Sequence, residues 1–319
     1  MMALALDILT TAAILFIVAS GLLIVFGVMK IINFAHGAFM TVGAYAALIT
    51  SNLALPAIMA PFLAFVLGGL LGAAAEFVIV RRLYHRPLDA ILATWGLAIV
   101  VGQLVTLIFG RGVQFVPAPV SGTTAVFGEN YSGYRLLLIP VAILIGALFT
   151  ALLTGTRLGL NTRAVIMNET LAQGLGIDSS RVRLLTFGIG SGLAAVAGAA
   201  VTPLASVDPN MGLPWLIGAF MLVMVSGGSM LTLALACFTL GGLQVLVSTF
   251  VSPILGGLTI AVLAAVALRL RPEGFARKDS TAPQLDFGLR RLHPSGAPQT
   301  RMDTRSHHGC HRRRRRSLL

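Results

Sequence analysis

The sequence predicts an all-α, polytopic helical membrane protein with about eight or nine transmembrane helices. Only 11% of its 319 residues are charged, less than half of the share of about 25% that is usual in soluble domains. Hydrophobic residues make up 56%, and the mean hydropathy is +0.90. Apolar runs near the length of about 20 residues that a helix needs to cross a bilayer recur along the chain.

Each apolar run has features that support a span. Residues 8–28 form a run too long for the hydrophobic part of a signal peptide, and only Asp7 and no basic residue precedes it, so we interpret it as an uncleaved span. Gly68 and Gly72 have the four-residue spacing that lets helices approach closely. The glycines at 227–228 interrupt the seventh run, which is either a full crossing or a broken helix. The expected spans are residues 8–28, 34–49, 56–80, 90–109, 136–153, 184–203, 214–230, 231–251 and 254–270.

Basic residues predict the orientation of these spans. Of the twelve that precede residue 272, only Arg111 and Arg135 fall in loops on one side, and ten fall on the other. By the positive-inside rule the richer side is cytoplasmic, so we expect a multi-pass protein of the cell (inner) membrane with its N-terminus outside and its C-terminus cytoplasmic. The ten are Lys30, Arg81, Arg82, Arg86, Arg157, Arg163, Arg181, Arg183, Arg269 and Arg271.

The net charge of +12 comes largely from the C-terminal end. Residues 272–319 hold eleven basic and four acidic side chains, which contribute +7, and no folded basic domain is expected. We therefore expect no nucleic-acid partner. We predict a transmembrane domain over residues 1–277 and a disordered, basic tail over 278–319. The arginines at 312–316 can bind anionic membrane lipid, or the tail can be an altered reading frame.

The chain offers no pattern for metal or cofactor binding. Cys237 lies in an apolar run and Cys310 in the tail, so neither a disulfide framework nor a metal site is expected. The only lysines are Lys30 and Lys278, and neither follows a glycine, which excludes a phosphate-binding loop. Glu76 is the single acidic residue well inside a span; it can serve ion coupling, reach the interface or pair with a neighbouring arginine. The bundle must therefore be passive or borrow energy from a partner.

The longest polar break in the apolar part covers residues 157–183. Its apolar residues share one helical face, being spaced three, four and four apart: Ala164, Met167, Leu171 and Leu175. Asn161 or Thr162 is a candidate cap at the start of this helix, and Gly176 is expected to end it in a left-handed turn. A cap at residues 178–180 would then begin the next span. This amphipathic helix can lie in the lipid interface, line other parts of the chain, or fit a groove on a soluble partner.

Four stretches carry a family resemblance, one of them within this polar break. G-L-L-I-V-F-G-V-M-K-I-I-N-F-A-H-G-A-F-M-T-V-G-A-Y at residues 21–45 resembles the N-terminal signature of LivH-type permeases of branched-chain amino acid ABC transporters. L-A-Q-G-L-G-I at 171–177 is similar to the cytoplasmic loop of that family. V-S-G-G-S-M at 225–230 and R-P-E-G-F at 271–275 also fit, so the resemblance covers residues 8 to about 277.

The resemblance implies an ABC importer permease fold and a subunit without its own ATPase, not an enzyme. Partners would be a second, LivM-like permease, two cytoplasmic ATP-binding subunits and an extracytoplasmic solute-binding protein. The loop over 157–183 would hold the coupling helix that docks on the ATPase. Of the wider permease signature E-A-A-x-x-x-G, only Ala172 and Gly176 remain, with Thr170 and Leu171 in the first two places. The implied coupling residues are Ala164, Met167, Glu169, Leu171, Ala172 and Gly176.

The implied substrates are branched-chain or similar small amino acids. Polar side chains and exposed backbone in the spans can bind such solutes, and each can equally bond another helix. The pathway candidates are Asn33, His36, Gly37, Thr41, Thr94 and Gln103. Two rival functions stay open. One is a self-sufficient secondary carrier or facilitator of small polar solutes such as urea and short amides, and the other is a membrane scaffold.

Overall fold

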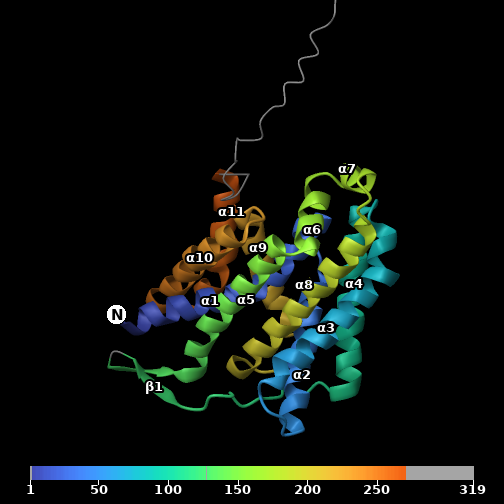
Figure 1. The fold of residues 1–319 in the computed structure, drawn as a ribbon. Coiled ribbons are helices and arrows are strands. Elements are labelled where there is room, and N and C mark those ends of the chain that lie inside the picture. Colours follow the sequence, from blue (N-terminus) through green and yellow to red (C-terminus); the bar gives the residue numbers. More distant parts are fainter. Residues whose placement is uncertain (1, 127, 271–319) are drawn as a thin grey trace, which may run out of the picture. The chain divides into compact units, whose positions relative to one another are not determined.

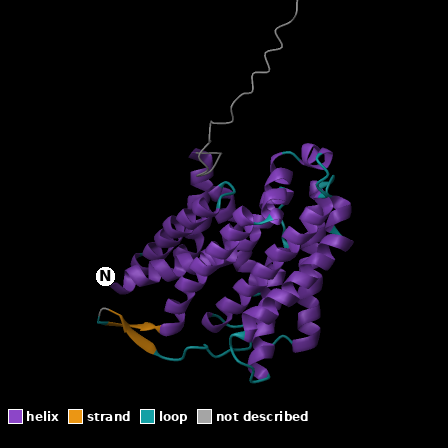
Figure 2. Ribbon diagram, in the orientation of Figure 1, coloured by secondary structure: helices purple, strands orange, loops and turns teal. Residues whose placement is uncertain are grey.

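The structure is a computed structural model that describes residues 2–126 and 128–270. The apolar runs of about 20 residues form helices in it. Within the described residues eleven α-helices are joined by short turns and one β-hairpin (Figures 1 and 2). The helices are α1 Met2–Met29, α2 Ala35–Asn52, α3 Met59–Val78, α4 Pro87–Phe109, α5 Gly133–Gly155, α6 Arg157–Met167, α7 Glu169–Gly174, α8 Ser179–Val201, α9 Gly212–Ser226, α10 Met230–Phe250 and α11 Pro253–Leu270.

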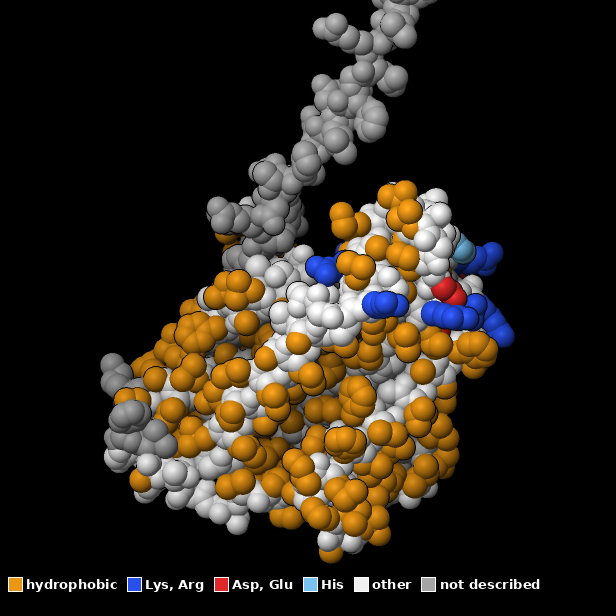
Figure 3. Space-filling view, in the orientation of Figure 1, with side chains coloured by type: hydrophobic (Ala, Val, Ile, Leu, Met, Phe, Trp, Pro, Cys, Tyr) orange, Lys and Arg blue, Asp and Glu red, His pale blue; other side chains and the backbone are white. Residues whose placement is uncertain are grey.

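The predicted all-α polytopic class is confirmed. Seven helices are long and apolar enough to cross a membrane, namely α1, α3, α4, α5, α8 with the short 3-10 turn after it, α10 and α11. Helix α2 is more polar and almost wholly buried, and α9 is shorter. The chain turns at 227–228, where both glycines have positive φ, so α9 and α10 are separate helices. Apolar side chains cover much of the outer surface, as expected for a surface that faces lipid (Figure 3).

Helix α1 supplies the largest share of the buried core, followed by α2 and α8. Helix α8 packs on α1, α2 and α3, and small residues allow this close approach. A Cβ added at Gly68 or Gly72 on α3 would fall within 2.8 Å of Ser191 on α8. The predicted close packing at this glycine pair is therefore confirmed.

The segment between α4 and α5 contains a small antiparallel hairpin, β1 Thr123–Val126 with β2 Glu129–Ser132. Tyr131 anchors it to α1, because its hydroxyl donates to Asp7 Oδ1 at 2.7 Å and lies 2.9 Å from Thr10 Oγ1. Burial, and then the hydrogen bond to Asp7, raise the pKa of Tyr131. The phenol therefore stays protonated and keeps donating to Asp7 at neutral pH.

The predicted tail over 278–319 and the R-P-E-G-F stretch at 271–275 lie outside the described residues. Arg271, which contributed to the predicted orientation, lies there too. The division at residue 277 therefore stays a prediction.

Candidate functional site

The polar break over 157–183 forms two helices where the sequence predicted one. Helix α6 begins at Arg157, and the hydroxyl of Thr156 caps it by accepting from the N–H of Gly159 at 3.2 Å. The expected caps Asn161 and Thr162 are wrong, because both lie inside α6. Asn168 leaves the helical conformation and its Oδ1 accepts from the N–H of Leu171 at 3.0 Å. An asparagine that caps a new helix in this way ends the first one.

The end of α7 agrees with the sequence-based expectation. Gly176 has φ +83°, and its N–H donates to the carbonyl of Gln173 at 2.9 Å. The N–H of Ile177 donates to the carbonyl of Ala172 at 3.0 Å. These two bonds make a Schellman ending, which needs a left-handed residue at the position of Gly176. Asp178 then caps α8 by accepting from the N–H of Arg181 at 3.1 Å, so the predicted cap is confirmed.

One side of the α6–α7 segment is anchored on the bundle. Ala172 on α7 and Val165 on α6 are buried against Val28 of α1 and Val182 of α8. Polar contacts add to this apolar cluster: Gln173 Nε2 donates to Ser179 Oγ at 2.8 Å, and Glu169 forms an ion pair with Arg183. Two helices of the bundle therefore hold α7 through side-chain contacts, in addition to the backbone that connects α7 to its neighbours.

The other side of the segment is apolar and exposed. Met167 is 86% exposed, Leu171 62% and Leu175 73%, whereas Ala164 packs against the anchoring cluster. The four residues predicted to share one face are thus divided between two sides, because the break at Asn168 changes the direction of the helix. Figure 3 shows apolar side chains at this projecting end, beyond a group of basic side chains. An apolar surface of this kind, on a segment that leaves the bundle, is typical of a docking site.

Five of the six pathway candidates lie close together around the start of α2. Asn33 Oδ1 accepts from the N–H of Ala35 at 3.0 Å, and Thr94 Oγ1 accepts from the N–H of Phe34 at 3.3 Å. His36 Nε2 lies 3.0 Å from the carbonyl oxygen of Val18. All three polar side chains are buried, and each of these contacts is made within the protein. The helix-to-helix bonds that the sequence left open as the alternative are therefore present for His36 and Thr94, whereas Asn33 bonds locally at the start of α2.

Gly37 and Thr41 continue this cluster along α2 toward α9. Thr41 Oγ1 accepts from the N–H of Gly212 at 3.3 Å, and a Cβ at Gly37 would lie 2.9 Å from the carbonyl oxygen of Gly212. Both residues line a small cavity of about 90 Å³ between α2, α4 and α9. The sixth candidate, Gln103, is exposed on α4 and is not among the residues that line this cavity.

Sequence reasoning missed two side chains of the site. It counted Arg183 only among the basic residues that predict the orientation, and it did not single out Tyr84. In the structure the Arg183 guanidinium stacks on the Tyr84 ring with Cζ 4.0 Å from the ring centroid. The Tyr84 hydroxyl donates to the carboxylate of Glu76. The sequence had left ion coupling, the membrane interface and an arginine partner open for this glutamate. The sequence does hold a signal for the contact between Glu76 and Tyr84. A glutamate inside a span is followed eight residues later, just beyond the end of that span, by a tyrosine.

The comparisons with known proteins agree with this architecture. A family model described as "Branched-chain amino acid transport system / permease component" matches residues 4–268, so the chain belongs to this family. It is the permease subunit of an ABC importer and a multi-pass membrane protein, and the predicted resemblance is confirmed.

Three relatives illustrate the similarity. The chain is 28% identical to the high-affinity branched-chain amino acid transport system permease protein LivH of Salmonella typhimurium, over 81% of this chain and 89% of that protein. It is 29% identical to the permease protein BraD of Pseudomonas aeruginosa, over 57% and 64%. It is also 29% identical to the probable branched-chain amino acid transport permease protein LivH of Methanocaldococcus jannaschii, over 67% and 70%.

Proposed function

We propose that this permease carries branched-chain or similar small amino acids across the cytoplasmic membrane, and that its α6–α7 segment receives the driving force from partner ATPases. It would act with a second, LivM-like permease, two ATP-binding subunits and an extracytoplasmic solute-binding protein. The names of its relatives support the substrate class. The apolar exposed side of α6–α7, opposite an anchored side, is the observation that carries the docking role.

A docking segment has to transmit force from the partner to the spans. ATP-driven closure of two ATPase subunits produces transport only if it moves something that is fixed to the spans. Residues Met167, Leu171 and Leu175 offer apolar contacts to such a partner, while Val165 and Ala172 fix the same segment to α1 and α8. A partner that buries the exposed side therefore moves the bundle.

The cluster around the start of α2 is our candidate for part of the pathway. It combines buried hydroxyl groups with a close backbone contact between Gly37 and Gly212. Because Gly37 and Thr41 line a cavity, a small separation of α2 from α9 would expose their polar groups to a solute. Movement of the bundle would thereby free polar groups for the solute that are now engaged in contacts between α2 and α9.

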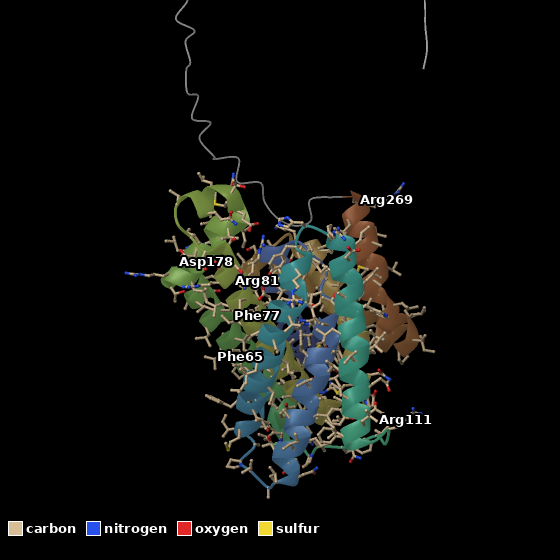
Figure 4. The ribbon with its side chains drawn as sticks, turned by 90° about the vertical axis from the view of Figure 1, so that its right-hand side faces the viewer. Phe65, Phe77, Arg81, Arg111, Asp178 and Arg269 are labelled. Atoms are coloured by element: carbon tan, nitrogen blue, oxygen red, sulfur yellow. The ribbon has the colours of Figure 1, made fainter. Side chains whose placement is uncertain are left out.

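Charge supports a cytoplasmic position for α6–α7. Basic side chains gather at the end of the bundle that carries this segment (Figure 3), and Arg269 and Asp178 lie toward that end whereas Arg111 lies at the other (Figure 4). In a Cys310→Ser background, Phe115→Cys should react with an impermeant maleimide in intact cells. Met167→Cys, in cells that lack the partner ATPases, should react only after permeabilisation. Both side chains are strongly exposed and Cys237 is buried, so each signal reports one position. Labelling of Met167→Cys from outside would contradict the orientation.

Reconstitution in proteoliposomes tests the function itself. We expect uptake of radiolabelled leucine only when the second permease, both ATPases, the binding protein and ATP are present. The chain alone is the matched control. Uptake of urea or short amides by the chain alone would instead support the self-sufficient facilitator, and competition by other amino acids would define the substrate range.

A further inference from the structure

Four side chains from separate parts of the chain form a continuous contact series beneath α7. Glu169 of α7 forms an ion pair with Arg183 of α8, and the Arg183 guanidinium stacks on Tyr84. Tyr84 lies between the 3-10 turn Val80–Leu83 and α4, and its hydroxyl donates to Glu76 on α3. We call Glu169, Arg183, Tyr84 and Glu76 the relay. It links the proposed docking segment to the corner between α3 and α4.

The relay is more shielded from water than the neighbouring surface pair, although the side chain of Glu169 at its α7 end is 33% exposed. The side chain of Arg183 is 14% exposed and Glu76 is fully buried, whereas the side chain of Arg181, which pairs with Asp178, is 84% exposed. Exposed ion pairs contribute little and exchange freely with water. Buried, hydrogen-bonded charges hold one geometry, because breaking a link leaves a charge without compensation.

Tyr84 can donate throughout the physiological pH range. Burial, and then the hydrogen bond to Glu76, raise the pKa of its phenol far above the ordinary value. The hydroxyl thus remains a donor to Glu76, and the ring remains a neutral platform for Arg183. Stacking of a guanidinium on an aromatic ring at this distance is a favourable cation–π geometry.

The main helix contacts of α7 are with α6 and α8 and not with the α3–α4 corner. Only two residues separate Tyr84 from Pro87, where α4 begins, and α4 carries Thr94 and Trp95. Thr94 accepts from the N–H of Phe34, and the Trp95 ring lies edge-on to Phe34 at 5.3 Å between centroids. The corner therefore connects directly to the wall of the candidate pathway.

We propose that Arg183 and Tyr84 are positioning residues that pass movement of α7 to α3 and α4, and thereby couple ATP hydrolysis to opening of the pathway. This proposal rests on the proposed docking of α6–α7. Docking alone moves α1 and α8, through the chain and the apolar cluster around Ala172, and it reaches α3 where α3 packs on α8. The relay adds a direct link to the corner between α3 and α4, since Arg183 holds Tyr84 and Tyr84 holds Glu76.

The assembled transporter in proteoliposomes tests the relay, with leucine uptake per ATP hydrolysed as the readout. Tyr84→Phe removes only the hydroxyl and keeps the ring under Arg183. We expect the ratio to fall roughly 3- to 30-fold while the ATPases still co-purify and hydrolyse ATP, as for mutations along a coupling network. Arg183→Lys keeps the charge but loses the planar stacking, and should reduce the ratio in the same way. Arg181→Gln, on the same helix and exposed, is the matched control and should leave it unchanged.

A double-mutant cycle separates transmission from a merely structural role. If Tyr84 acts through Glu76, combining Tyr84→Phe with Glu76→Gln should lower the ratio no further than the more severe single change does. A ratio within about twofold of the unmodified protein in both Tyr84→Phe and Arg183→Lys, with normal ATPase co-purification, would overturn the relay and leave the proposed function standing. Failure of the unmodified chain to retain the ATPases would instead contradict the docking itself.

Discussion

Replacing Leu171 by aspartate is expected to abolish uptake without preventing membrane insertion. Leu171 is 62% exposed on the apolar side of α7, so the change disturbs little of the bundle. Burial of a leucine side chain in the complex contributes up to about 3 kcal/mol, so its loss weakens binding by as much as roughly 100-fold. The aspartate carboxylate would in addition have to lose its water in the interface, which weakens binding further. The measurement is co-purification of the ATPases with the tagged permease, together with leucine uptake.

Two comparison variants make this result specific. Leu171→Met keeps the apolar contact and should retain the ATPases and uptake. Leu53→Asp introduces the same change at similar exposure, 63%, near the end of α2 that lies away from α7, and should still retain the ATPases (Figure 1). Normal uptake by Leu171→Asp would show that this side of α7 is not the docking surface.

Ala172→Arg should also stop uptake, but by another route. Ala172 is buried against Val28, Val165 and Val182, so an arginine there cannot fit without lifting α7 from the bundle. We therefore expect the segment of this variant to become sensitive to protease in inside-out vesicles, whereas Leu171→Asp should stay as resistant as the unmodified chain.

Local chemistry explains which parts of the segment the sequence predicts. Gly176 and Asp178 act on backbone groups a few residues away, so a turn or cap at either position can be recognised without knowing the fold. The spans are equally local, since each is an apolar run bounded by polar residues. Asn168 is different, because an asparagine is tolerated inside a helix and the apolar spacing of Met167 and Leu171 continues across it.

The remaining features depend on contacts between distant residues. Arg183 and Tyr84 are far apart in the sequence, and no local pattern indicates that one stacks on the other. In a membrane protein an apolar residue can face either lipid or the core, so composition alone does not separate exposed Leu171 from buried Val165. For the same reason the exposure of Gln103, in contrast to buried Thr94 on the same helix, could not be predicted.

Replacing Gly43 by alanine is expected to destabilise the bundle far more than its single added methyl group suggests. Gly43 lies on α2 where that helix crosses α8, and a Cβ there would fall 1.8 Å from the carbonyl oxygen of Ala195. All three of the nearest atoms belong to the backbone of Ala195, so no side-chain rotation relieves the clash. The helices must separate, and overpacking of this kind costs about 1–3 kcal/mol or more.

Gly96→Ala is the matched control for this prediction. Gly96 also lies inside a helix, α4, but a Cβ there meets nothing within 4 Å. Alanine favours a helix over glycine by up to about 1 kcal/mol, so the control should be unchanged or slightly more stable. Thermal unfolding of the purified protein in detergent should therefore show a lower midpoint for Gly43→Ala only. Equal midpoints would mean that α2 and α8 can move apart at little cost. The close approach of these two helices, which also brings Gly198 against Met40, would then contribute little to stability.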